Sequence, residues 1–261
     1  MNEREKIGRY FAAGGAGEQA DRLLDLAAAV RGGRPYAVSG FMTPPAGQIA
    51  STIVAHFPNL VADEWGGYPG AERTKIMFRR AEYRGEADWQ ISAVRAEWDA
   101  RYRLVGHRDV LGSLLGLGLE RDVFGDVIMQ GATAQVVVDT PLSGYLLTEW
   151  KQVANVGIRV TELATTEIVP KEETCKELRA TVASLRLDAV GAAGFGISRS
   201  KMAAAVAAEK VRVNWQRAKG PAQTLAVGDV ISFRGRGRVV LAELTGTSRK
   251  GRAGVRLERY L

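Results

Sequence analysis

Cysteine and histidine are scarce in this chain, and long apolar runs are missing. The single cysteine, Cys175, excludes an internal disulfide and any metal site built from several cysteines. Neither His56 nor His107 has a partner at the spacing of a zinc site. No apolar run reaches the roughly 18 residues of a membrane-spanning helix, and the charged N-terminus leads into no signal-peptide core. We therefore expect a soluble protein of a reducing compartment, the cytoplasm or a plastid stroma, with no cofactor, no metal and no membrane insertion.

The motifs of the common catalytic classes are also missing. No phosphate-binding loop is present, and Gly116-Leu117-Gly118 lacks the third glycine of a dinucleotide fingerprint. His107-Arg108-Asp109 has the first residues of a protein-kinase catalytic loop, but the required asparagine is replaced by Leu114. No Gly-x-Ser-x-Gly elbow occurs. We expect that the protein is not an enzyme.

Positive charge is abundant, and it is unevenly distributed. Residues 182–261 contain 15 Lys and Arg against 5 Asp and Glu, a net charge of +10, whereas residues 1–181 contain 21 against 24, a net of −3. A basic domain on a mildly acidic body is typical of proteins that bind a polyanion. The division therefore indicates nucleic acid as the partner of the last third of the chain.

Apolar periodicity predicts an α+β protein. Residues at three- and four-residue steps from Ala20 to Val30 form a helical stripe, and Thr43-Pro44-Pro45 suits the start of a second helix. Strands at 75–79, 89–95, 127–130 and 134–138 alternate with helices from His107 and Pro141, which suggests a sheet covered by helices on one side. We expect an N-terminal helical and α/β segment at 1–70, a middle domain at 71–165, a linker at 166–181 and a basic domain at 182–261.

The basic domain contains a helix start that suits an anion. Ser198 is a strong N-cap candidate, and Arg199 and Lys201 follow in the first turn of the helix. Cations there oppose the helix dipole, whereas the free N–H groups and two basic side chains form a ready phosphate site. We expect Arg199 and Lys201 to project into solvent, so that their removal weakens RNA binding and leaves the fold intact.

Five sequence elements in this region resemble the S-four (alpha-L) RNA-binding domain, which is named for a small-subunit ribosomal protein. They are Arg186-Leu187-Asp188, a glycine turn at 194–196, Ser198-Arg199, Val211-Arg212-Val213-Asn214, and Leu225 with Gly228-Asp229 before a strand. Two residues depart from the family pattern. Glu209 and Trp215 stand where the family commonly has glycine.

The whole chain resembles the YlmH family of bacterial RNA-binding proteins, whose photosynthetic counterpart is the photosystem II S-four-domain protein. The resemblance rests on the basic tail after Arg234 and on three upstream stretches, which are 41–44, 66–73 and 107–126. It implies a ferredoxin-like (RRM-like) middle domain between the N-terminal segment and the S-four end. It also implies binding to ribosomal RNA, on large subunits stalled with peptidyl-tRNA or in photosystem II biogenesis.

We expect the RNA contacts to come from the basic domain. The candidate residues are Ser198, Arg199, Lys201, Lys210, Arg212, Asn214, Trp215, Arg234, Arg236, Arg238, Arg249, Lys250 and Arg252. Trp215 either stacks on RNA or packs against its own domain, and the sequence leaves both interpretations open. His107 and Arg108 are a possible second RNA surface.

Two other functions remain open. S-four domains often accompany RNA-modifying enzymes such as pseudouridine synthases, although the only Arg-Leu-Asp here, at 186–188, belongs to the S-four helix. The chain could also be an assembly factor whose main partner is a protein. Structured RNA, namely ribosomal RNA and possibly tRNA on the large subunit, is the partner that the charge division and motif order favour.

Overall fold

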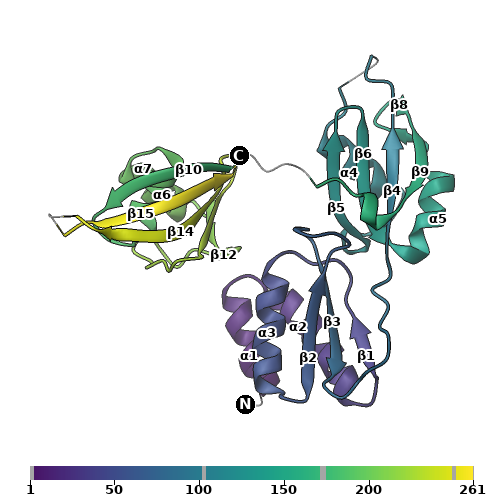
Figure 1. The fold of residues 1–261 in the computed structure, drawn as a ribbon, viewed down its shortest axis with the longest axis horizontal. Helices are drawn as coiled ribbons and strands as arrows, with labels where there is room; N and C mark the ends of the chain where they lie inside the picture. Colours follow the sequence, from purple (N-terminus) through teal and green to yellow (C-terminus); the bar gives the residue numbers. More distant parts are fainter. Residues whose placement is uncertain (1–2, 102–103, 171–174, 249–250, 261) are drawn as a thin grey trace. The chain divides into compact units, whose positions relative to one another are not determined.

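The computed structural model describes residues 3–101, 104–170, 175–248 and 251–260 (Figure 1). Residues 1–171 and 172–261 form two compact units, each with its own core. The first unit contains an N-terminal domain and a middle domain, and the second is the C-terminal domain. Each unit is described by itself.

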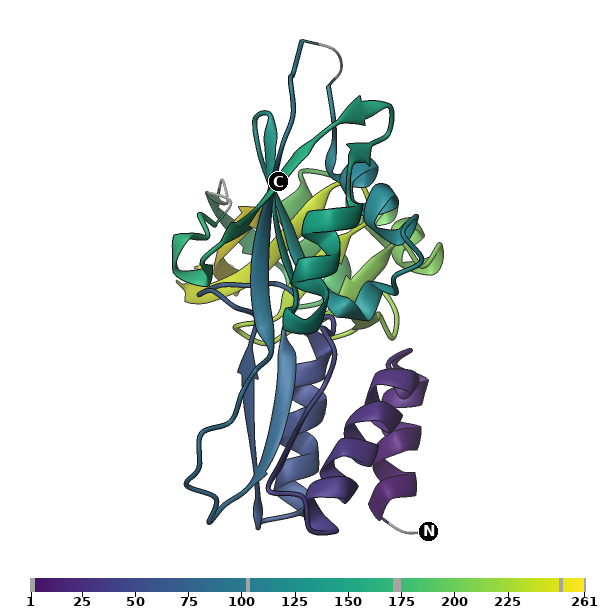
Figure 2. The same ribbon diagram turned by 90° about the vertical axis from the view of Figure 1, so that its right-hand side faces the viewer.

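The N-terminal domain places three helices on one side of a three-stranded antiparallel sheet (Figure 2). The apolar stripe from Ala20 to Val30 is buried in this core, as its periodicity predicts. Ile76 and Phe78 supply the sheet side of the core. The elements are α1 (Glu3–Ala13), α2 (Gly17–Arg31), β1 (Tyr36–Val38), α3 (Pro45–His56), β2 (Leu60–Trp65) and β3 (Lys75–Arg80), with strand order β1-β3-β2.

The middle domain has the ferredoxin-like topology. Its four main strands and two helices follow the order β-α-β-β-α-β, and the sheet order β5-β6-β4-β9 places the first and third of these strands in the centre. Both helices pack on one face, against Val94, Val136 and Val138. The elements are β4 (Ile91–Glu97), α4 (His107–Leu115), a 3-10 turn η1 (Arg121–Val123), β5 (Phe124–Gln130), β6 (Thr133–Asp139), α5 (Thr140–Glu149), the short pair β7 (Gln152–Val153) and β8 (Val156–Gly157), β9 (Arg159–Leu163) and a second 3-10 turn η2 (Thr165–Glu167).

The boundary between these two domains differs from the expected 70/71. Strand β3 begins at Lys75 and pairs with both β1 and β2, so the N-terminal sheet extends to Arg80. The stretch from Gly66 to Gly70, next to the expected boundary, is a loop between two strands of the same sheet. Glycine permits such a turn within a domain as readily as between domains.

The C-terminal domain packs two helices on one face of a six-stranded antiparallel sheet (Figure 1). Ser198 precedes the second helix as its N-cap, and this confirms the predicted helix start. Gly196 has a left-handed φ of 65°, which ends the first helix. The elements are β10 (Cys175–Val182), α6 (Leu187–Phe195), α7 (Arg199–Ala207), β11 (Val211–Val213), β12 (Gln216–Arg217), β13 (Val230–Phe233), β14 (Gly237–Thr247) and β15 (Ala253–Tyr260), with sheet order β10-β15-β14-β13-β11-β12.

The expected linker at 166–181 ends inside this sheet. Strand β10 pairs with β15 along its whole length, from Cys175 opposite Tyr260 to Val182 opposite Ala253. It is an edge strand, and only Leu178, Ala180 and Val182 are turned toward the core. Because the alternate positions are polar and exposed, the segment had the composition of a linker while it carried the period-two pattern of a strand.

Candidate nucleic-acid interface

The start of α7 is capped by a serine and carries one unpaired cation. The hydroxyl oxygen of Ser198 accepts a hydrogen bond from the Lys201 backbone N–H at 3.3 Å. The Lys201 side chain is exposed, and among the described residues no carboxylate pairs with it. Backbone N–H groups at a helix start attract anions, and Lys201 adds charge at the same place.

Arg199 is exposed like Lys201, but it also pairs with a carboxylate of its own domain, which the expectation that its removal leaves the fold intact did not include. Its Nη2 lies 2.9 Å from Oδ2 of Asp188. Arg186 also donates to this carboxylate, from Nη2 to Oδ2 at 3.0 Å and from Nε to Oδ1 at 3.2 Å. Asp188 is only 6% exposed, so the two guanidinium groups neutralise a buried carboxylate. Burial raises the pKa of Asp188, but the hydrogen bonds and charges of Arg186 and Arg199 outweigh burial and hold that pKa below its ordinary value. Arg199 therefore stabilises the fold and also adds positive charge to the surface.

Asn214 is also engaged inside the domain. Its amide nitrogen donates to Asp229 at 2.8 Å, and its amide oxygen accepts from the Val230 backbone N–H at 2.9 Å. Asp229 in turn accepts from the Ala226 backbone N–H at 2.8 Å. The asparagine and the Gly228-Asp229 pair of the S-four pattern thus fasten the β11–β12 hairpin to the start of β13.

Backbone angles explain both departures from the S-four pattern. Asn214 and Trp215 are the central residues of the two-residue β11–β12 hairpin, with φ values of 49° and 61°. Positive φ at both positions is typical of the type I′ turn, which favours Asn-Gly. Glu209, which follows α7, has a φ of 56°. Glycine adopts these angles without strain, whereas another residue loses about 1–2 kcal/mol at each.

Strand register gathers arginines on the sheet face that lies opposite the helices. Arg212 of β11 is paired with Arg217 of β12 on one side and with Ser232 of β13 on the other. Ser232 is paired with Arg238 of β14, and Arg238 with Tyr260 of β15. Directly paired residues point to the same face, so these side chains form one row across the sheet. We call Arg217, Arg212, Ser232, Arg238 and Tyr260 the arginine row.

The end residues of the row were not among the sequence candidates. The Arg238 guanidinium carbon lies 4.7 Å from the centre of the Tyr260 ring, so the aromatic ring supports the arginine. Burial, followed by a hydrogen bond to Glu258, raises the pKa of Tyr260 to about 12. Arg217 pairs with Glu209. Only the pairing register identifies Arg217 and Tyr260, and register is not visible in a single sequence.

The remaining sequence candidates lie at the ends of strands. The Arg234 backbone N–H donates to the Lys210 carbonyl at 2.9 Å, which brings the residue before β11 and the β13–β14 turn together. Arg236 lies over the Phe233 ring at 5.6 Å. Arg252 donates to the Thr181 carbonyl at 2.9 Å. Arg249 and Lys250 lie outside the described residues.

Models of known protein families match each of the three domains. Family models match residues 16–83 ("YlmH, N-terminal"), 85–167 ("Putative RNA-binding domain in YlmH") and 185–231 ("S4 domain"). A Bacillus subtilis (strain 168) protein named "Ribosome-associated protein quality control protein P2" is 32% identical over 197 residues, which cover 74% of this chain and 76% of the relative. The chain belongs to the YlmH family. A solved structure named "Cell division protein ylmH from Streptococcus pneumoniae" has the same fold, with a TM-score of 0.52 at 17% identity over 59% of this chain and 94% of that one.

In the middle domain, the sheet face that lies opposite the helices is covered by other parts of the chain. Proteins of the RRM class stack bases on the sheet face that lies opposite the helices. Here that face carries Ala93, Ile128 and Val137, which are buried against Phe41 and Tyr68 of the N-terminal domain and against Ile168. Residues 85–167 also contain 7 Lys and Arg against 12 Asp and Glu, a net charge of −5. The covered face and the negative charge both disfavour RNA binding through this sheet.

Hydrogen bonds hold the segments around Phe41 and Tyr68 against this sheet face. Asp126 accepts hydrogen bonds from the Tyr68 hydroxyl at 2.6 Å and from the backbone N–H groups of Glu72 and Arg73 at 2.7 and 3.0 Å. The Arg73 side chain donates to the carbonyls of Phe41 and Phe124 at 2.6 and 3.0 Å. The upstream stretches on which the family resemblance rests thus meet at the junction of the two domains. Phe41, Arg73 and Asp126 therefore help to join these domains.

His107 and Arg108, the possible second RNA surface, lie in the first turn of α4 and are exposed. Asp109 accepts a hydrogen bond from the Gly106 backbone N–H at 2.9 Å and caps this helix. Arg108 also lines a surface pocket with Asp109, Glu149 and Lys151, so its surroundings have mixed charge. A role in RNA binding stays a prediction for both residues.

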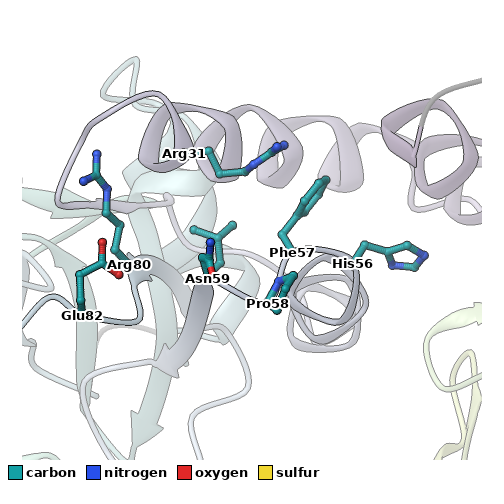
Figure 3. Close-up of a pocket in the computed structure, with 8 residues that line it drawn as sticks. Arg31, His56, Phe57, Pro58, Asn59, Arg80 and Glu82 are labelled. Atoms are coloured by element: carbon teal, nitrogen blue, oxygen red, sulfur yellow. The ribbon is translucent and has the colours of Figure 1, made fainter.

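A pocket in the N-terminal domain also contains arginines, but these cations have partners there (Figure 3). The guanidinium of Arg31 lies over the Phe57 ring at 4.2 Å, and Arg80 donates to the Val30 carbonyl at 3.3 Å. Arg31 and His56 are the last residues of α2 and α3. The C-terminal end of a helix carries partial negative charge and attracts cations, so Arg31 stabilises α2.

No group of His, Cys, Asp and Glu side chains able to hold a metal ion occurs among the described residues. Within the same part of the chain, no helix is long and apolar enough to cross a membrane.

Proposed function

We propose that this protein is a non-catalytic RNA-binding protein that binds ribosomal RNA on the large ribosomal subunit through its C-terminal domain. The supporting observation is the joint presence of Lys201 at a capped helix start and the arginine row on the opposite sheet face. Residues 172–261 carry 17 Lys and Arg against 8 Asp and Glu, a net charge of +9, whereas residues 1–171 carry 19 against 21. Basic residues arranged in this way bind phosphates without reading a sequence. A role in ribosome-associated protein quality control follows the name of the Bacillus subtilis relative.

The carboxylates that an RNA-modifying enzyme would need are occupied by structural contacts. Asp188, in the only Arg-Leu-Asp of the chain, is buried between two arginines. Asp126 holds the junction of two domains, and Asp109 caps α4. These positions favour the non-catalytic role over a pseudouridine synthase. The photosystem II role remains an implication of the sequence resemblance alone.

Sedimentation with large ribosomal subunits tests the proposal. We expect the wild-type chain to sediment with the subunits and the double variant Lys201→Ala with Arg212→Ala to lose most of this association, because each residue supplies charge without a carboxylate partner in the described part of the chain. Arg79→Ala, which removes a cation paired with Asp63 in the N-terminal domain, is the matched control. Association that is unchanged in the double variant would contradict the proposal.

Incubation with ribosomal RNA tests the enzyme alternative. We expect the nucleoside composition of the RNA to stay unchanged when it is digested and measured by mass spectrometry, with derivatisation to reveal pseudouridine. New pseudouridine or new methyl groups, abolished by Asp188→Asn, would replace the proposal with the RNA-modifying one.

A further inference from the structure

The Trp215 ring has no partner of its own in the described part of the C-terminal domain. The residue is half-buried, yet it belongs neither to the apolar core nor to the partly buried residues that pack against that core. Its carbonyl accepts a hydrogen bond from Arg212 at 3.2 Å. Among the described residues, its indole N–H has no acceptor, and its ring has no aromatic or cationic neighbour.

Trp150 shows what a structural tryptophan looks like in the same chain. It is 1% exposed, lies in the core of the middle domain, and its Nε1 donates to the Ser113 hydroxyl at 2.9 Å. A buried tryptophan normally has such a partner for its N–H group. Packing explains Trp150 and does not explain Trp215.

Strain makes the position of Trp215 more informative. Its φ of 61° is one that glycine adopts freely and a tryptophan does not. A residue held at such an angle without compensating packing indicates a function at that place. The hairpin tip also lies directly beyond the paired residues Arg212 and Arg217, which carry the charge that attracts a nucleic-acid backbone.

We propose that Trp215 stacks on an unpaired nucleobase, and that the C-terminal domain therefore prefers RNA in which an unpaired base lies next to the phosphates bound by Arg212. This inference rests on the proposed function, since it names the kind of RNA that the domain binds. A base in a continuous duplex is already stacked on both faces, so only an unpaired base has a face free for the indole ring.

The test compares two RNA hairpins that differ by one unpaired adenosine in the stem, using the full-length chain and fluorescence anisotropy. We expect Trp215→Gly to lower affinity for the bulged hairpin by about tenfold, the effect of losing one base–aromatic stack, and to change affinity for the perfect hairpin by less than about twofold. Trp215→Tyr keeps an aromatic face and retains the preference. Glu209→Gly relieves the same kind of backbone strain without removing an aromatic ring, but it also frees Arg217 from its ion pair, so it is the control for stability and not for affinity.

A folding defect is separated by thermal unfolding. Trp215→Gly and Glu209→Gly both keep or raise the melting temperature, so weaker binding in the first variant cannot come from unfolding. Placing 5-iodouridine at the unpaired position adds a direct readout, which is a photocrosslink to the peptide that contains Trp215. Equal binding of the bulged hairpin by wild type and Trp215→Gly would overturn the inference while the proposed function stands. If the wild-type chain bound neither hairpin at low salt, both would be overturned.

Discussion

The Arg-Leu-Asp motif predicts where Asp188 lies in the fold, but it does not predict which side chains Asp188 contacts. The Arg-Leu-Asp element correctly located the start of α6, and Ser198 correctly marked the start of α7. The ion pair between Asp188 and Arg199 joins these two helix starts across eleven residues, and no local pattern indicates it. Arg199 was therefore predicted as a free phosphate ligand, whereas Lys201, two positions later, has that environment.

The charge network around Asp188 predicts acid sensitivity of the C-terminal domain. The folded-state pKa of Asp188 is depressed, so its contribution to stability is fully present above its unfolded pKa of about 3.9 and is lost as the pH falls through the folded value. We expect Asp188→Asn to reduce the free energy of unfolding by about 1–3 kcal/mol at pH 7 and to remove part of the acid sensitivity.

Amide hydrogen exchange in α6 and α7 of the full chain measures this loss. The matched control is Glu243→Gln, which breaks an exposed ion pair with Arg256 and should change stability by less than about 1 kcal/mol. Equal effects of the two substitutions would show that the burial of Asp188 has no energetic consequence.

At the scale of elements, the sequence predicted the type of most helices and strands but not the surfaces that they cover. The strands expected at 89–95 and 134–138 are β4 and β6, whose Val94, Val136 and Val138 face the helices. Val137 and Ala93, on the other face, are also buried, because residues from the N-terminal domain pack there. That contact joins segments far apart in the chain. The edge strand β10 was missed for a related reason, since its polar residues concealed a pairing partner located about 80 residues later.

Gly125, at the junction of the two domains, gives a prediction about how tightly this sheet face is packed. A Cβ atom at Gly125 would lie 2.9 Å from both Phe41 Cε1 and Val137 Cβ, and both of these residues are fully buried. We expect Gly125→Ala to destabilise residues 1–171 by about 1–3 kcal/mol, because the packed core has no room for the methyl group.

Gly112→Ala is the control for this substitution. An added Cβ at Gly112 meets nothing within 4 Å, and the residue lies inside α4. Alanine there should raise stability by up to about 1 kcal/mol through helix propensity. Thermal unfolding of the full chain compares the two, and a Gly125→Ala variant as stable as wild type would mean that the sheet face is not tightly covered.

Over the whole molecule, the distribution of charge could be read from the sequence, whereas the domain boundaries could not. Net charge can be counted from the sequence without knowledge of register, and it places the RNA-binding potential in the last third of the chain. The sequence did not show that the basic side chains lie on both sides of one sheet. It depends on which strands pair, and the neighbours β14 and β15 lie beyond the residues that match the S4 domain model.

The two compact units lead to a prediction about affinity and salt. Because residues 172–261 contain their own apolar core and nearly all of the excess positive charge, a fragment of these residues should retain most of the RNA affinity of the full chain. Its binding constant should fall with salt at a slope of roughly 0.7–0.9 per phosphate neutralised on a logarithmic scale. Lys201→Ala and Arg212→Ala should each reduce that slope by about one, whereas Trp215→Gly should lower affinity and leave the slope unchanged, because stacking releases no counterions.

Fragment 1–171, with its slight negative charge and covered sheet, should bind weakly at every salt concentration. Titrations of one RNA hairpin at several salt concentrations measure all of these slopes, and binding by 1–171 as tight as that of the full chain would move the RNA surface to the first unit.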